Sequence, residues 1–395
     1  MVYNQLVSKE SRGHSYVGNC MSESSQLALL GLDRAEIGAL VEHAEEPQYR
    51  AQQLIEAVYR QRVESIEEIS TLSQQLRLKL MQDGVSIGAP TIEKRFVSVD
   101  GTVRYLIAFA DGQSVETVWM PEGDGGESEE GAGDSEAAGK ARGWGRATIC
   151  ISSQVGCAVD CQFCLTALLG LKRNLSAGEI VGQVLAVLKD QKVLPQHDRI
   201  NLVFMGMGEP FLNYDNFIKA VRLLVQEVGL AESRMTVSTA GIVPRIYDFG
   251  QEEIRPRLAI SLNASNDDQR SQLMPLNKKW NFESLLAAAR QFPLRNRERV
   301  TFEYVLLHNV NDLKEHAEQV VELLRGIKAR VNLIALNPGP GLDFETPADA
   351  SVAEFQKILR DSGILTFVRR PRGRDIYAAC GQLKRTVEIA TAPAQ

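Results

Sequence analysis

The sequence predicts an α/β protein in which a partial (β/α)6 barrel follows a small N-terminal accessory domain of helices and β-hairpins. From residue 147 onward, seven strand-like runs alternate with helix-like segments, which is typical of a parallel barrel covered by helices. Residues 22–121 instead read first as amphipathic helices and then as hairpins. A stretch rich in Gly, Ser and acids separates the two regions.

The accessory domain is predicted over residues 22–121. In "LDRAEIGALVEHA" and "YRAQQLIEAVYRQRV" the apolar residues recur at three- and four-residue spacing, as one face of a helix requires. "IEKRFVSVDGTVRYLIAF" then has an Asp-Gly turn between alternating runs, and "ADGQSVETVWM" repeats that signal. We expect residues 1–21 to be a loose tail or an over-called start, since Met21 directly follows Cys20, for which no role is expected.

Charge is unevenly distributed along the chain, whose net value is −6. The predicted loop over residues 122–146 has too few apolar residues to order itself, and it concentrates acids at Glu122, Asp124, Glu127, Glu129, Glu130, Asp134 and Glu136. Residues 369–385 are basic, with only Asp375 against Arg369, Arg370, Arg372, Arg374, Lys384 and Arg385. Such a basic run indicates either a nucleic-acid partner or a solvated surface.

The barrel is predicted over residues 147–370, followed by a C-terminal segment over 371–395. The helix from Ser176 to about Lys192 opens with a Ser-x-x-Glu capping box formed with Glu179. The seven expected strands lie at 147–152, 200–205, 235–240, 257–262, 300–307, 331–336 and 365–370. In parallel barrels the chemistry lies at the carboxyl ends of the strands, so functional motifs should directly follow them.

Composition narrows the class of protein. No run of about 18 apolar residues is present, so no membrane span is expected. The first residues lack the apolar core of a secretory signal, which favours the cytoplasm. Six cysteines among 395 residues are no disulfide framework, and three of them crowd together, which in a reducing compartment indicates metal binding or catalysis.

The crowded cysteines are Cys157, Cys161 and Cys164, spaced C-x3-C-x2-C directly after the first barrel strand. A zinc knuckle with a distant fourth ligand is one interpretation, although closed zinc sites usually show a second close pair of ligands. The other is a 4Fe–4S cluster held by three thiolates, which leaves one iron open to another ligand. Three such ligands, with Phe163 before the last of them, resemble the radical S-adenosylmethionine (SAM) superfamily, in which SAM binds the open iron.

Small polar residues follow the other strands. "MGMGEP" supplies Gly206, Gly208 and Glu209, with glycines for close backbone approach and a carboxylate that accepts hydrogen bonds from the amine of SAM. The remaining residues expected to contact SAM follow later strands, at Ser238, Ser261, Leu262, Asn263 and Asn337. Ser and Asn also commonly cap helices and turns at such positions, so each one alone is a weak signal.

Two further cysteines lie outside the cluster motif. Cys150 lies within the first barrel strand, where a free cysteine is often only a small buried apolar residue. Cys380, in "AACG", follows the arginine-rich stretch, which should favour its thiolate.

Taken together, "ICISSQVGCAVDCQFC", "MGMGEP", "LAISLNA", "PLNKKW", "LNPGPG" and "RRPRGRDIYAACGQL" resemble the radical SAM adenine-C2 methyltransferases of 23S rRNA and tRNA. The resemblance runs from the N-terminal helices to about residue 390, with the acidic loop as an insertion. It implies a partial (β/α)6 radical SAM barrel, a 4Fe–4S cluster and two SAM molecules per turnover.

The resemblance also implies roles for individual residues. Cys380 matches the cysteine that is methylated by a first SAM, and Cys150 matches the one that resolves the protein–RNA adduct and ends in a disulfide with Cys380. Glu116 matches the proposed proton acceptor, although the insertion lies between it and Cys150. Relatives often carry His where this chain has Asn263, and both side chains can hydrogen-bond a ribose.

The partners that the resemblance implies are 23S rRNA, tRNA and a flavodoxin- or ferredoxin-type electron donor, with a monomeric enzyme and no membrane. Arg369 to Arg374, and also Lys278 and Lys279, are expected to hold RNA phosphates. Two alternatives stay open: a C8-specific methyltransferase of the same rRNA adenine, as in chloramphenicol–florfenicol resistance, and a non-catalytic iron–sulfur or zinc protein that binds RNA.

Overall fold

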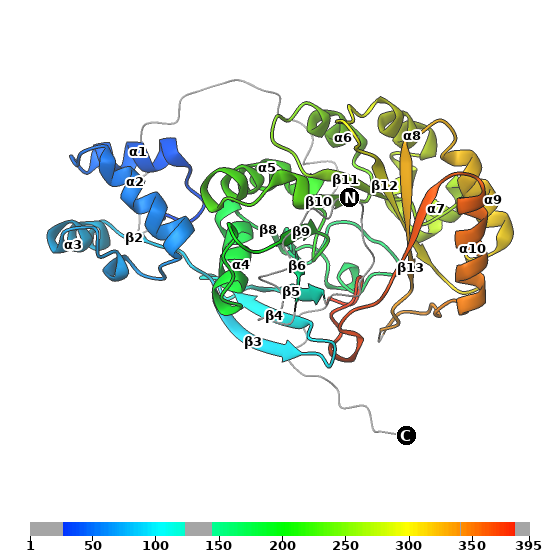
Figure 1. Ribbon diagram of the computed structural model, residues 1–395, viewed down its shortest axis with the longest axis horizontal. Coiled ribbons are helices and arrows are strands. Elements are labelled where there is room, and N and C mark those ends of the chain that lie inside the picture. The colour runs from blue at the N-terminus through cyan, green and yellow to red at the C-terminus, as the bar shows by residue number, and fades with distance from the viewer. Residues whose placement is uncertain (1–26, 123–143, 340, 384–395) are drawn as a thin grey trace.

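The computed structural model describes residues 27–122, 144–339 and 341–383 (Figure 1). The predicted tail over residues 1–21 and most of the predicted acidic loop lie outside these ranges. The dominant element is one ten-stranded sheet, in which the strands follow the order β14-β13-β12-β11-β10-β9-β6-β5-β4-β3.

Seven neighbouring strands of this sheet are parallel and form the partial barrel. They are β6 (Arg146–Cys150), β9 (Ile200–Phe204), β10 (Met235–Thr239), β11 (Arg257–Ser261), β12 (Val300–Leu306), β13 (Ala329–Ala335) and β14 (Leu365–Arg369). Each one overlaps a strand expected from the sequence, so the predicted fold class is confirmed. Most of the apolar residues of these strands are buried, most completely in β11 and β12, because helices cover the outer face of the sheet.

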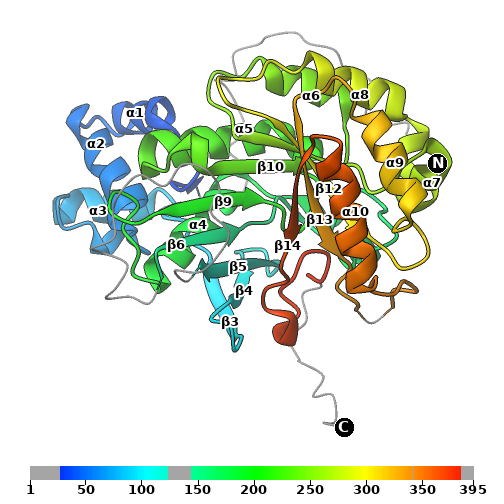
Figure 2. The same ribbon diagram turned by 45° about the vertical axis from the view of Figure 1, so that its right-hand side comes forward.

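The barrel helices connect successive strands and lie on the outside of the sheet, as Figure 2 shows for α9 and α10. Their bounds are α4 (Ala177–Asp190), α5 (Tyr214–Leu223), α6 (Val243–Gly250), α7 (Asp267–Leu273), α8 (Phe282–Gln291), α9 (Lys314–Leu323) and α10 (Asp349–Asp361). The predicted capping box is present on α4. Ser176 Oγ accepts the amide of Glu179 at 3.1 Å, and the Glu179 carboxylate accepts the amide of Ser176 at 2.8 Å.

The N-terminal hairpins continue the barrel sheet. β3 (Thr91–Val97), β4 (Val103–Ala108) and β5 (Ser114–Glu122) pair antiparallel in sequence, and β5 then pairs antiparallel with β6. This last pairing puts Val118 opposite Cys150, so the hairpin region and the first barrel strand share one surface. The domain limits drawn from the sequence remain predictions.

The N-terminal helices pack beside the barrel, next to α4 and α5 (Figure 1). They are α1 (Arg34–His43), α2 (Tyr49–Ile55) and α3 (Gln74–Gln82), flanked by the short parallel pair β1 (Leu27–Ala28) and β2 (Val85–Ser86). Ion pairs tie α1 to the barrel, with Arg34 at 3.0 Å from Glu227 and Lys219 at 2.7 Å from Glu36. No helix in the three described ranges is both long and apolar enough to span a bilayer.

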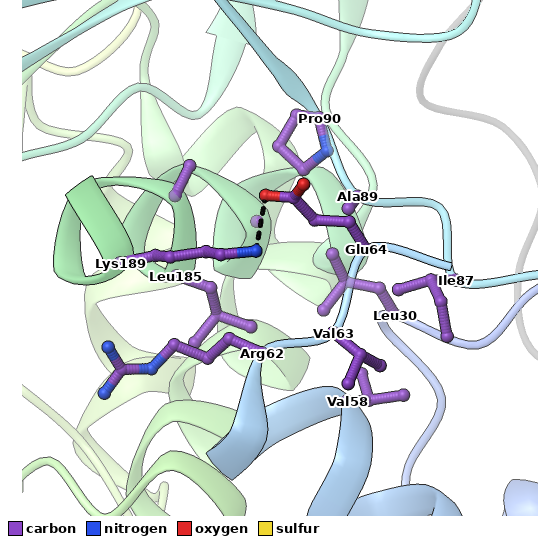
Figure 3. Close-up of a pocket in the computed structure, with 12 residues that line it drawn as sticks. Leu30, Val58, Arg62, Val63, Glu64, Ile87, Ala89, Pro90, Leu185 and Lys189 are labelled. Carbon is purple, nitrogen blue, oxygen red and sulfur yellow. Dashed lines mark ion pairs between the residues drawn. The ribbon is translucent and has the colours of Figure 1, made fainter. Parts of the chain in front are cut away.

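A small pocket lies where the segments that flank these helices meet α4 (Figure 3). Its walls are mostly apolar, including Leu30, Val58 and Leu185, and an ion pair of 2.8 Å joins Lys189 to Glu64 beside them. None of its lining residues is a site residue expected from the sequence.

Candidate radical SAM active site

The three clustered cysteines lie on one loop that follows β6. The loop is closed at its base by the antiparallel pair β7 (Gln154–Val155) and β8 (Arg173–Asn174), and by a 3.3 Å hydrogen bond from the amide of Cys157 to the carbonyl of Gly170. Gly156 has a φ of +80°, and a Cβ there would lie 1.8 Å from that same carbonyl oxygen. Only glycine therefore fits at the start of the loop.

The cysteine thiols are half-buried and face a shared apolar wall that includes Val159, Phe163 and Met274. Burial raises the pKa of Cys157 to about 12, and burial together with the neighbouring thiols raises the pKa of Cys161 well above its usual value. Bound iron overcomes such a preference for the thiol, because a coordinated thiol is deprotonated outright. Three neighbouring thiols on one loop fit an iron–sulfur cluster, because thiolates are the usual protein ligands of such clusters.

The described part of the chain has no group of three or more His, Cys, Asp or Glu side chains arranged around a single ion. Cluster binding does not require such an arrangement, because each thiolate would bind a different iron atom.

Glu209 is a nearly fully buried carboxylate beside the cysteine loop. It caps the short 3₁₀ helix η5 (Pro210–Asn213), and its two oxygens accept the amides of Phe211 at 3.0 Å and Ala240 at 2.6 Å. Burial raises its pKa to about 7, while these amides lower it in part. No Lys, Arg or His forms an ion pair with it among the described residues, so the amine of SAM fits as the missing donor.

The glycines before Glu209 are explained by packing. Gly208 has a φ of +101°, and a Cβ on it would lie 2.7 Å from the amide nitrogen of Gln154, whose side chain in turn accepts the amide of Glu209. The glycine thus brings Glu209 against the first barrel loop. Contact between Gly208 and SAM stays a prediction.

The polar residues after the other strands gather at the same end of the barrel. Ser238 and Ser261 lie with their hydroxyl oxygens 3.5 Å apart, and both are partly accessible. Asn337 is buried, and its Oδ1 has no hydrogen-bond partner within the described ranges. An orphaned buried acceptor of this kind fits a ligand donor, because leaving it unpaired is costly.

Asn263 and Leu262 have partners within the protein. Asn263 adopts a φ of +57°, which Asn tolerates better than most residues. Its Oδ1 accepts the backbone amide of Val305 at 2.9 Å, and its Nδ2 lies 3.3 Å from the sulfur of Met274. Leu262 is fully buried. The structure thus explains both residues locally, and their predicted contacts with SAM remain untested.

Cys150 and Cys380 are brought together although they lie far apart in the sequence. Cys150 ends β6 and is buried, and its pKa is raised by burial and by the nearby Cys380 thiol. Both cysteines are free thiols, so the expected disulfide is not formed in this state. The arginine-rich flank does not favour a Cys380 thiolate as expected. Cys380 is exposed as a residue, but loss of solvent around its sulfur and the nearby Glu303 carboxylate raise its pKa to about 11. Arg369 lowers this pKa in part.

The segment that carries Cys380 is held on both sides. Before it, the amide of Gly373 donates to Asp100 at 3.0 Å and Asp375 accepts the Ser98 hydroxyl at 2.6 Å, which fixes the segment to the β3–β4 turn. Figures 1 and 2 both place the red C-terminal segment beside these strands. After it, the carbonyl of Gly381 accepts the amide of Leu165 at 2.8 Å, one residue beyond Cys164.

Glu116 is engaged in a fully buried ion pair with Arg104, which also stacks over the ring of Phe96. Its backbone carbonyl accepts the Ser152 hydroxyl at 2.7 Å, so it lies close to β6. The charged neighbours that perturb Cys380 most are Glu303, Arg369 and Cys164, and Glu116 is not among them. A proton-accepting role for Glu116 stays a prediction.

Sequence reasoning missed two buried charges at this end of the barrel. Glu303, on β12, accepts a hydrogen bond from the side-chain Nδ2 of Asn332 at 2.8 Å and faces Cys380 and Arg369, and burial raises its pKa. Arg270, on α7, is fully buried. The acid inside the apolar run "VTFEYVLL" was the available signal for Glu303, because a charged residue in a strand buried on both faces needs a reason.

Comparison with known proteins agrees with this geometry. Residues 27–85 match the family described as "Ribosomal RNA large subunit methyltransferase N-terminal domain", and residues 151–324 match the "Radical SAM superfamily". A probable dual-specificity RNA methyltransferase RlmN of Koribacter versatilis (strain Ellin345) is 64% identical over 351 residues, which is 89% of this chain and 99% of that protein. The chain belongs to the RlmN family.

Other RlmN relatives support the assignment across most of the chain. The dual-specificity RNA methyltransferase RlmN of Campylobacter jejuni (strain RM1221) is 44% identical over 340 residues, or 86% of this chain and 93% of that protein. The crystal structure of a radical SAM methyltransferase from Sphaerobacter thermophilus is 40% identical and superposes with a TM-score of 0.81, covering 91% of this chain and 100% of that one. The predicted family, fold and enzyme class are therefore confirmed.

Proposed function

We propose that this RlmN-family chain methylates C2 of a specific adenine in 23S rRNA, at the peptidyl-transferase centre, and of the adenine 3′ of the anticodon in tRNAs. The proposal rests on the family membership and on one observation in particular. Two free thiols, Cys150 and Cys380, meet at the mouth of the barrel beside the loop that carries Cys164. A pair of free thiols next to the cluster loop fits an enzyme that transfers a methyl group through a cysteine better than it fits a protein that only binds a cluster.

Different residues of the site would bind the cluster and SAM. When bound, a 4Fe–4S cluster and SAM together supply a 5′-deoxyadenosyl radical. Cys157, Cys161 and Cys164 would hold the cluster, and Glu209 would accept hydrogen bonds from the amine of SAM. Ser238, Ser261 and Asn337 would orient the rest of that cosubstrate at the strand ends, with Gly208, Leu262 and Asn263 shaping the wall.

The two thiols would carry the methyl group and release the product. Cys380 accepts a methyl group on its sulfur and loses a proton in that step. After hydrogen abstraction, the carbon on that sulfur would add to C2 of adenine, because a carbon radical can add to a position that is a poor nucleophile. The adduct would then return one electron to the cluster and lose the C2 hydrogen as a proton. When the Cys150 thiolate attacks the Cys380 sulfur, the electron pair of the carbon–sulfur bond goes to the methylene carbon, which takes up a proton, and a disulfide and methylated adenine remain.

The surface around Cys380 suits RNA. Arg369, Arg370 and Arg374 are exposed next to it, where guanidinium groups can contact phosphates. We further propose a monomeric enzyme in the cytoplasm that receives electrons from a flavodoxin- or ferredoxin-type protein. Lys384 and Arg385 lie outside the described residues.

Nucleoside mass spectrometry tests the function directly. In a strain that lacks the gene, the wild-type chain should restore 2-methyladenosine to 23S rRNA and tRNA, and so should Cys20→Ser, the matched control. Cys380→Ala should restore none, and Cys150→Ala should accumulate a covalent protein–RNA adduct. Restored 8-methyladenosine would show the other regiochemistry, and no modified adenosine from the wild-type chain would refute the proposal.

A further inference from the structure

Arg270 is a fully buried arginine at the same end of the barrel as the cysteines. Its Nε donates to the carbonyl of Leu262 at 3.1 Å, and its Nη1 donates to Oδ1 of Asn277 at 2.9 Å. Its Nη2 donates to the carbonyls of Ala240 at 2.7 Å and Ser261 at 2.9 Å. The guanidinium therefore joins the ends of β10 and β11 and is held in one orientation.

All four of these acceptors are neutral. Within the described ranges, no carboxylate lies at ion-pair distance from Arg270, unlike the buried Arg104 and Arg255, which pair with Glu116 and Glu298. Burying an unpaired charge is costly, and desolvation lowers the pKa of Arg270 to about 10. The group still carries its proton at neutral pH, so a positive charge remains in the protein interior.

The cysteine loop lies against the residues that surround this charge. The amide of Gln162 donates to the carbonyl of Leu273 at 3.0 Å, directly after Cys161 and one turn beyond Arg270 on α7. Ala240, Leu273 and Met274 line the apolar cluster against which the three cysteines pack. Cys161 also lies close enough to Arg270 for its thiolate form to raise the pKa of the guanidinium, as Asp267 does.

One residue, Ala240, links this cation to the carboxylate on the other side of the site. The amide of Ala240 donates to Glu209 at 2.6 Å, while its carbonyl accepts from Arg270 at 2.7 Å. The positions of the two charges are thereby fixed relative to each other. Neither can move without breaking a hydrogen bond of a buried peptide, which is expensive.

We propose that Arg270 is a positioning residue whose fixed positive charge raises the reduction potential of the cluster held by Cys157, Cys161 and Cys164. The inference rests on the proposed function. A cluster with three thiolates is negatively charged and gains one more negative charge when the donor protein passes it an electron. A nearby cation in a dry environment stabilises the reduced form more than the oxidised form.

Two substitutions separate the charge from the hydrogen bonds. Arg270→Gln removes the charge, whereas Arg270→Lys keeps a charge and loses the planar set of donors. Arg255→Gln is the matched control, because Arg255 is also buried but precedes β11, at the opposite end of the strand from Ser261. Each protein is purified without oxygen, its cluster is reconstituted, and the reduction is followed by electron paramagnetic resonance in a potentiometric titration.

Arg270→Gln should lower the equilibrium constant of one-electron reduction at least tenfold, which is about 59 mV for each factor of ten. Arg270→Lys should stay within about threefold of the wild type, and Arg255→Gln should lose thermal stability without a shift in potential. An unchanged potential in Arg270→Gln, an equal shift in both Arg270 variants, or a variant that folds but holds no cluster would overturn the inference. If Arg270→Gln does not fold, a tenfold shift in Arg270→Lys would overturn it and an unshifted potential would support it. A wild-type protein without a 4Fe–4S signal would refute the proposed function itself.

Discussion

Replacing Glu209 by glutamine should weaken SAM binding strongly while leaving the stability of the SAM-free protein almost unchanged. The carboxylate is buried, accepts the amides of Phe211 and Ala240, and has no cationic side chain as a partner among the described residues. Glutamine has nearly the same shape and keeps one acceptor oxygen. Its amide nitrogen cannot accept the second backbone N–H.

The magnitude follows from the raised pKa of Glu209. Burial moves it from 4.5 to about 7, and one pKa unit corresponds to about 1.4 kcal/mol, so the ionised group costs about 3 kcal/mol at pH 8. Between pH 4.5 and 7 the native state binds more protons than the unfolded chain, so the stability of the SAM-free protein falls as pH rises through this window. Glutamine removes that cost but leaves one N–H unpaired, which costs about 1–3 kcal/mol, and the two changes nearly offset each other.

Bound SAM should recover the cost, because its amine donates to the carboxylate. Loss of about 3 kcal/mol corresponds to roughly a hundredfold in Kd, so Glu209→Gln should bind SAM about a hundredfold more weakly at pH 8. The amine of SAM also changes its protonation state in this pH range. The quantity to follow is therefore the ratio of the Kd of Glu209→Gln to the Kd of the wild type. The ratio should fall by up to about tenfold per pH unit below pH 7, because protonated Glu209 resembles glutamine.

Isothermal titration of SAM into cluster-loaded protein between pH 6 and 8.5 measures this ratio, and thermal unfolding without SAM measures the stability. Glu227→Gln is the control, since Glu227 is also a buried carboxylate but pairs with Arg34. Equal affinities for wild type and Glu209→Gln, or a ratio that does not vary with pH, would refute the reasoning.

Three other substitutions have defined outcomes. Arg104→Met should lower the free energy of unfolding by about 3–5 kcal/mol, because it breaks a buried ion pair, and Arg104→Met with Glu116→Leu should recover most of that loss in denaturant titration. Gly208→Ala should lower the unfolding midpoint and the fraction of protein that holds SAM, since a Cβ would lie 2.7 Å from the Gln154 amide, and an unaltered midpoint would contradict this. Thr166→Val removes the 2.7 Å hydrogen bond from the Thr166 hydroxyl to the carbonyl of Leu383. Hydrogen exchange of the backbone amides at residues 381–383 should become about fivefold faster, which corresponds to about 1 kcal/mol, while the exchange rates in helices α1 to α3 should stay the same.

The parts of the fold that are encoded locally were predictable. The alternation of apolar runs located all seven parallel strands, and the pair Ser176 and Glu179 marked the start of α4, because both signals depend on residues close together in the sequence. The continuation of the sheet from β5 into β6 was not predictable. It depends on Val118 pairing with Cys150 across the acidic stretch, and no local pattern encodes that register.

The site was predictable where spacing carries the chemistry, as for Cys157, Cys161 and Cys164. It was not predictable where burial decides the role. Asn263 reads as a ligand contact in sequence, which stays a prediction, and only the folded chain shows that its side chain also contacts Val305 and Met274. Arg270 reads as one more helical cation, and only the folded chain shows that it is buried with four neutral acceptors.

Anchoring on both sides of Cys380 determines which partner has to move in the proposed reaction. The span between Asp375, fixed to Ser98, and Gly381, fixed to Leu165, is short, and the cysteine sulfur cannot leave the mouth of the barrel while both anchors hold. An adenine stacked within folded RNA does not present C2 to an atom that is fixed at the mouth of the barrel. The nucleotide itself must unstack and swing out to the enzyme, so RNA sites that already hold their adenine loosely should be modified fastest.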